Sequence, residues 1–165
     1  MIINHSFHKT KPTGDEYDLF YDDLDDEVDR NDLKELMRLL EAGADVNSAY
    51  KDGMTCLMYT AREGNYQATK LMIVNNASVN MKTKDNVTAL FMACWPARYL
   101  NIEIIRLLLE NGADANAANH RGKTCLMSPV INSEAAQLLL DYKADINKED
   151  SKGLTALHHA IAKTI

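Results

Sequence analysis

Three neighbouring residues look at first like part of a phosphate-binding loop. Gly122, Lys123 and Thr124 form the Gly-Lys-Thr end of such a loop, whose backbone amides and lysine would hold the phosphates of a nucleotide. The motif also needs a glycine five positions before its second glycine, and Ala117 stands there. We therefore interpret the three residues as a tight turn followed by a helix cap, and we expect no cofactor.

Histidines and cysteines are the other candidates for chemistry. His158 and His159 are adjacent, so on a helix they would point about 100° apart and could not form an i,i+4 metal pair. The spacing of Cys56, Cys94 and Cys125 is not that of zinc ligands, and no histidine is placed beside any of them to activate a nucleophile. Their odd number favours buried free thiols in a reducing compartment. We expect no metal and no enzymatic activity.

Acidic residues are concentrated near the start of the chain. Residues 15–32 contain ten acidic side chains and one basic side chain, Arg30. Phe20, Leu24 and Val28 follow one another in this segment at i,i+4 steps, which predicts a helix with one apolar face. We interpret about residues 16–30 as a helix that caps the first structural unit with a polar outer surface. A dedicated site for a basic partner is the alternative.

The overall composition argues against several classes of protein. The 165 residues have a formal net charge of −6, whereas nucleic-acid binding requires a sustained basic surface, so we expect no nucleic-acid partner. No apolar run approaches the length of about 20 residues that a membrane-spanning helix needs. The first residues, Met1–His5, do not resemble a secretory signal. We expect a protein of the cytoplasm or nucleus.

Two short phrases recur along the chain at nearly constant spacing, and they define the elements that position these residues. The intervals between successive copies are 33, 36 and 31 residues for both phrases. The first phrase ends at Asn47, Asn80, Asn116 and Asn147. The second phrase begins at Thr55, Thr88, Thr124 and Thr155. A period near 33 predicts a solenoid of small units that are stable only when stacked.

Each unit contains signals for a turn and two short helices. In one unit Gly53 favours a tight turn, Thr55 is a good helix cap, and Gly64 separates the first helix from the second. Asn86 stands where the other turns have glycine, which predicts a left-handed backbone there. In the next unit, apolar residues over 102–109 predict a second helix with a wide apolar face.

These phrases resemble the ankyrin repeat, whose unit is a hairpin followed by two antiparallel helices, the first opening with Thr-Pro-Leu-His. The resemblance covers residues from about 20 to the end of the chain. The proline is replaced in all four copies, and the histidine survives only as His158. The resemblance implies an all-α ankyrin-repeat solenoid of stacked helix-turn-helix units joined by hairpin loops.

The repeat phrases divide the chain into six segments. They are a mobile N-terminal tail (1–14), an acidic capping helix and first repeat (15–49), a second repeat (50–82), a third repeat with an inter-helix insertion (83–118), a shortened fourth repeat (119–149) and an incomplete fifth repeat (150–165).

Three local features of these segments lead to specific expectations. In the first repeat, residues 31–32 should form a turn before the second helix. In the fourth, Pro129 is expected inside the first helix, where it would kink and destabilise the unit, so that Pro129→Ala should raise the unfolding midpoint. The fifth should expose Leu157 and Ile161 because it lacks a second helix, and we expect the chain to be part of a longer protein.

The resemblance also implies a function, which is recruitment of a protein partner through the hairpin tips and the concave face of the first helices. The alternative is a regulatory or substrate-docking segment of a larger enzyme or of a pathogen effector acting in the host cytosol. Lysines at the tips would suit an acidic protein surface, and we expect a monomer. The positions marked for partner binding are Tyr50, Lys51, Asp52, Met54, Arg62, Lys84, Val87, Trp95, Arg98, His120, Arg121, Lys123 and Lys152.

Trp95 is the most distinctive of these positions because it is the only tryptophan in the chain. Tryptophan is enriched at the centres of protein interfaces. The alternative is that its ring packs beneath the irregular turn at residues 96–99. The sequence leaves both possibilities open.

Overall fold

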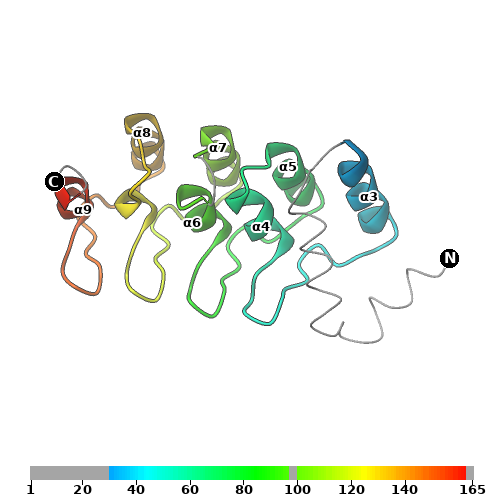
Figure 1. The fold of residues 1–165 in the computed structure, drawn as a ribbon, viewed down its shortest axis with the longest axis horizontal. Coiled ribbons are helices and arrows are strands. Elements are labelled where there is room, and N and C mark those ends of the chain that lie inside the picture. Colours follow the sequence, from blue (N-terminus) through cyan, green and yellow to red (C-terminus); the bar gives the residue numbers. More distant parts are fainter. Residues whose placement is uncertain (1–29, 97–99, 163–165) are drawn as a thin grey trace.

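The computed structural model describes residues 30–96 and 100–162, which form an elongated row of helical units (Figure 1). The described part contains no strand, only one isolated bridge between Ala49 and Thr55. This architecture confirms the predicted all-α solenoid. In chain order the helices are α3 (Arg30–Glu41), α4 (Cys56–Arg62), α5 (Tyr66–Val74), α6 (Ala89–Cys94), α7 (Ile102–Glu110), the 3-10 helix η2 (Cys125–Met127), α8 (Ser133–Asp141) and α9 (Ala156–Ala162).

The helices form two rows, with the hairpin loops projecting beside the first row (Figure 1). One row contains the first helices of successive units, α4, α6, η2 and α9, each packed on the next. The other row contains the second helices α3, α5, α7 and α8, which also pack in order. Packing between neighbouring units is the arrangement expected of a solenoid whose individual units cannot bury their own apolar faces.

Side-chain caps begin most of these short helices. The Thr55 and Thr88 hydroxyls accept from the backbone N–H groups of Met58 at 3.3 Å and Phe91 at 3.2 Å, which confirms the predicted cap at Thr55. Thr124, at the same repeat position, makes no cap bond, and its hydroxyl is buried without a partner. A buried, unpaired hydroxyl is unusual in a folded protein.

Asparagines in the turns that follow the second helices connect neighbouring units by hydrogen bonds. Asn80 donates to the Gly112 carbonyl at 2.8 Å and accepts from the backbone N–H of Asp114 at 2.9 Å. Asn116 repeats the pattern one unit later, with the Lys143 carbonyl and the backbone N–H of Asp145. The recurring asparagine therefore serves contact between units.

The leucine of the second phrase is buried in each unit against which a further unit is stacked. Leu57 and Leu90 are each 1% exposed, and Leu126 is 8% exposed. Leu157 is 68% exposed and Ile161, one turn later on α9, is 54% exposed, as expected from the sequence. Burial at this position thus depends on the neighbouring unit.

The expected turn at residues 31–32 is wrong, because both residues are helical within α3. The expected mobile tail (1–14) and the capping helix over about 16–30 lie outside the described residues, apart from Arg30.

The expectation that Pro129 interrupts a helix is also wrong. The first helix of that unit is a single 3-10 turn that ends at Met127, and Ser128 follows with extended backbone (φ −67°, ψ 135°). A residue before proline is driven out of the helical region, so the helix ends before the proline rather than bending around it. Pro129 is exposed and has no helix to kink, which removes the basis for a stabilising Pro129→Ala.

Candidate functional site

The hairpin loops are held in register by backbone hydrogen bonds between neighbouring units. Lys84 N–H donates to the Asp52 carbonyl at 2.7 Å, and His120 N–H donates to the Asp85 carbonyl at 2.8 Å. Ser151 N–H continues the series by donating to the Arg121 carbonyl at 2.9 Å. These hydrogen bonds join the loops, which lie in one row along the solenoid (Figure 1), into a continuous edge.

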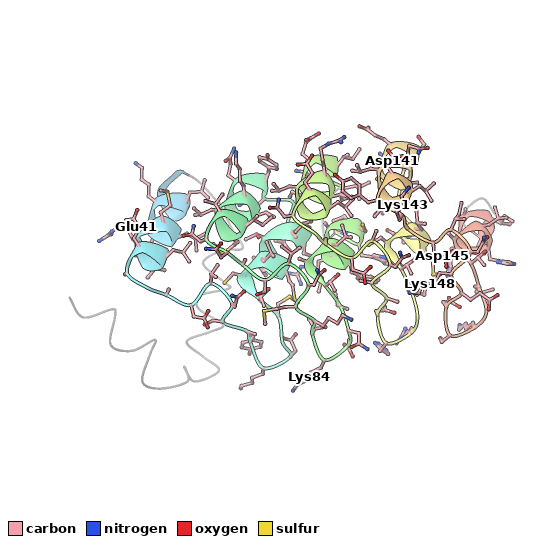
Figure 2. The ribbon with its side chains drawn as sticks, turned by 180° about the vertical axis from the view of Figure 1, so that it is seen from behind. Glu41, Lys84, Asp141, Lys143, Asp145 and Lys148 are labelled. Carbon is pink, nitrogen blue, oxygen red and sulfur yellow. The ribbon has the colours of Figure 1, made fainter. Side chains whose placement is uncertain are left out.

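Most of the predicted tip residues are exposed along this edge. The exposed side chains are Lys51, Asp52, Lys84, His120, Arg121 and Lys152. Lys84 points outward from the end of its loop (Figure 2). Tyr50, Met54, Val87 and Lys123 are half-buried nearer the base of the loops. The structure brings these predicted residues onto one edge, whereas Arg98 lies outside the described residues.

Trp95 packs against the body of the protein while remaining partly accessible. Its ring stacks on Phe91 with centroids 5.4 Å apart and planes 5° from parallel. The Lys123 ammonium lies over the same ring, 5.4 Å from its centroid, in a cation–π contact. The indole Nε1–H is buried without an acceptor. Trp95 is thus half-buried, with features of both interpretations that the sequence left open.

Arg62 occupies the repeat position of Trp95 one unit earlier, and its charge is largely satisfied within the protein. Its Nε donates to the Glu63 carboxylate at 2.8 Å, and its guanidinium lies 5.2 Å from the centre of the Tyr59 ring. The sequence did not single out Tyr59 or Phe91. Phe91 lies four residues before Trp95, a spacing that places two side chains on one helix face and was an available signal.

The cysteines have the properties of core residues rather than reactive groups. Cys94 and Cys125 are fully buried, and all three cysteines are free thiols. Burial raises the pKa of Cys56 to about 12 and also raises the pKa of Cys94, whose neighbour Cys125 adds to the effect. Because the thiolate is the nucleophile and metal ligand, these shifts oppose both roles.

Two further kinds of site are absent from the part of the chain that the structure describes. No group of three or more His, Cys, Asp or Glu side chains there could hold a metal ion. Within the same ranges, every helix is too short or too polar to span a bilayer. The features that remain as a candidate site are the hairpin edge and the aromatic cluster beside it.

Asp150 forms the base of the last hairpin. Its side chain is 2% exposed, and one carboxylate oxygen lies 2.9 Å from the Nε2 atom of His159. The other oxygen accepts from the backbone N–H groups of Lys152 and Leu154. The hydrogen bond to His159, aided by these two amides, lowers the pKa of Asp150 to about 2 against the opposing effect of burial.

We expect Asp150→Asn to lower the unfolding midpoint at pH 7, with a difference from the wild type that shrinks as the pH falls from about 4 to about 2. A carboxyl whose pKa is lowered by folding stabilises the protein above its unfolded pKa of about 3.9, and this stabilisation is lost as the folded carboxyl becomes protonated. Urea unfolding at a series of pH values measures the difference.

Asn119 shows why asparagine is the appropriate replacement, since it holds the equivalent position and accepts from the Arg121 and Lys123 amides. Asp150→Ala is the control, because it also removes these acceptors and should retain part of its penalty at low pH. A difference for Asp150→Asn that stays constant down to pH 2 would contradict the proposed role of the charge.

Comparison with known proteins gives matches along most of the chain. The family model of ankyrin repeats (3 copies) matches residues 27–119 and 96–164. "Ankyrin repeat and KH domain-containing protein mask-1" of Caenorhabditis elegans is 37% identical over 90 residues, covering 54% of this chain and 3% of that protein. "Ankyrin repeat, SAM and basic leucine zipper domain-containing protein 1" is 34% identical in Otolemur garnettii and 32% in Mus musculus, each over 103 residues, or 61% of this chain and 20% of the relative.

Proposed function

Since the chain belongs to the ankyrin-repeat family, whose members are generally protein–protein interaction modules, we propose that it is a non-catalytic module that recruits another protein. The recruiting surface is the row of hairpin tips together with the adjoining face of the first helices. The observation that supports this most directly is the series of backbone hydrogen bonds between hairpins, which holds exposed side chains of three or more units on one edge.

A preformed edge is well suited to binding. Association is opposed by the loss of conformational freedom in loops and side chains, and a surface whose backbone is already fixed loses less. The exposed Lys51, Lys84, Arg121 and Lys152 favour a partner with an acidic surface. Electrostatic complementarity of this kind would raise the association rate and select among partners more than it would raise affinity.

The curated relatives are much longer proteins than this chain. The chain spans about a fifth or less of the length of the curated relatives it matches, and their names include KH, SAM or basic leucine zipper domains. This observation supports a module within a larger protein, but it does not favour the enzyme or the pathogen effector of the alternative. We further propose a location in the cytoplasm or nucleus, where the three free cysteines would remain reduced.

Site-specific photo-crosslinking tests the proposed surface. Lys84→p-benzoylphenylalanine places a photoreactive group on a hairpin tip, and the same change at Lys70, which is exposed on α5, places it on the opposite row of helices. After irradiation in a cell extract, we expect a discrete set of crosslinked proteins from position 84 and little from position 70. Equal crosslinking from both faces, or none from position 84, would argue against recruitment by the hairpin edge.

A further inference from the structure

Three of the four arginines whose side chains the structure describes lie beside a carboxylate, and the exception is in the fourth unit. Arg38, Arg62 and Arg106 lie 3.0, 2.8 and 3.8 Å from the carboxylates of Glu35, Glu63 and Glu103, respectively. Arg121 instead contacts the ring of His120, with 3.3 Å between Nε and Nε2. Among the described residues no carboxylate pairs with Arg121.

Lys123, in the same hairpin, is likewise without an acidic partner among the described residues. Its ammonium rests over the Trp95 ring, which connects the fourth hairpin to the end of α6 in the third unit. The hairpin sequence Asn119–Lys123 contains no acidic residue, whereas the corresponding segments of the other units contain Asp52, Asp85 and Asp150. Arg121 and Lys123 thus bring two cations without a carboxylate partner to the junction between the third and fourth units, where Asp85 Oδ1 lies 3.5 Å from Nδ1 of the adjacent His120.

Apolar surface adjoins these cations. Because the first helix of the fourth unit is only one 3-10 turn, the chain continues through an exposed Pro129 and through Val130, which is 45% exposed. The Ser128 hydroxyl donates to the Cys94 carbonyl, so this segment lies beside the end of α6 that holds Trp95. Trp95 itself is only partly buried.

We propose that this junction anchors a partner through an acidic, extended peptide segment that also bears an apolar side chain. A partner carboxylate pairs with Lys123 and Arg121, and the apolar side chain packs against Trp95 and Val130. The inference deepens the proposed function, on which it rests, by naming the chemistry of the partner and the place where it is held.

The geometry favours this occupant for two reasons. A lysine already held on an aromatic ring has lost much of its rotamer freedom, so pairing with a carboxylate costs less entropy than at a free lysine. Large, partly buried aromatic residues beside charged groups are also typical of the few positions that dominate binding energy at interfaces. Nucleic acid would need a sustained basic surface, which a chain of net charge −6 does not offer, whereas two neighbouring cations suffice to pair with a peptide carboxylate.

Selection from short random peptides displayed on phage tests the inference and does not require the partner to be identified first. We expect the wild-type protein to enrich peptides that combine Asp or Glu with an aromatic or aliphatic residue. The double variant Arg121→Gln/Lys123→Gln should not enrich them. Enrichment of peptides without an acidic excess, equal enrichment by the double variant, or no enrichment would overturn the inference.

Titration with the most enriched peptide then locates its site, because Trp95 is the only tryptophan and its fluorescence reports on the junction directly. We expect saturable quenching, with an affinity about tenfold weaker for Arg121→Gln/Lys123→Gln. The control Lys34→Gln/Lys70→Gln removes the same charge from exposed sites on α3 and α5 and should change the affinity by less than about twofold. Equal weakening by the two double variants would overturn the inference.

Two further outcomes would distinguish a peptide site from a general anion site, and failure of the junction from failure of the proposed function. Displacement of the peptide by a single-stranded RNA of matching charge at equal concentration would show a general polyanion surface and would overturn a peptide-specific anchor. If crosslinking from position 84 captures a partner while Arg121→Gln/Lys123→Gln leaves that capture unchanged, the proposed function stands and the junction is not its anchor.

Discussion

Leu90→Ala is expected to lower the free energy of unfolding by about 2–5 kcal/mol, whereas Leu157→Ala should lower it by less than about 0.5 kcal/mol. The two leucines occupy the same position of the repeat phrase, and the chemical change is identical. Leu90 is 1% exposed, so truncation removes buried methyl groups and leaves a cavity between units. Leu157 is 68% exposed and has few packed neighbours to lose. Urea unfolding followed by far-ultraviolet circular dichroism measures both changes.

The comparison isolates the contribution of stacking because helix propensity changes equally in α6 and α9. A penalty at Leu157 as large as that at Leu90 would mean that the apolar face of α9 is covered in solution. Sedimentation of the wild type and Leu157→Ala would then identify a self-associated species. A small penalty at both positions would contradict the central premise that the units are stable only through their neighbours.

The repeat phrases predicted the fold well because each phrase position has one physical task. Thr55 begins a helix by accepting a backbone hydrogen bond, and Asn86 takes a left-handed conformation (φ 61°) where other units use glycine. Both tasks depend on residues within a few positions along the chain. Local chemistry of this kind can be read from a single sequence.

The two wrong expectations arose where the phrases give no guidance. Residues 31–32 precede the first recognisable phrase, so only turn propensity was available, and the helix extended through them. At Pro129 the repeat pattern was extended by analogy with other units, although the proline restricts the residue before it and ends the helix. At Pro129 the local preference of one residue overrode the average pattern.

The candidate site was less predictable than the fold. Trp95 and Lys123 were each marked by position, but their contact depends on stacking of the third unit on the fourth. Arg62 was marked with equal weight, yet Glu63 and Tyr59 already occupy its guanidinium. Which cations are left unpaired is a property of the assembled solenoid, and the position of a residue within its repeat does not determine it.

Gly122→Ala is expected to lower the free energy of unfolding by about 2–4 kcal/mol, compared with about 1 kcal/mol for Gly153→Ala. Both glycines have a left-handed backbone, at φ 73° and 74°, so an added Cβ causes similar local strain. At Gly122 this Cβ would also lie 3.0 Å from both the Asp150 Cα and the Ser151 N. These are backbone atoms of the next hairpin and cannot move away without shifting the loop.

The control is close, because an added Cβ at Gly153 meets only the Glu149 Oε2 atom, at 4.0 Å. The extra penalty at Gly122 therefore measures how tightly neighbouring hairpins approach. Amide hydrogen exchange gives a second readout, since the Ser151 N–H donates to the Arg121 carbonyl and should lose protection in Gly122→Ala. Equal penalties for the two variants, with Ser151 still protected, would mean that the hairpins separate at little cost. The edge would then be a set of flexible loops, and a partner would have to order them on binding.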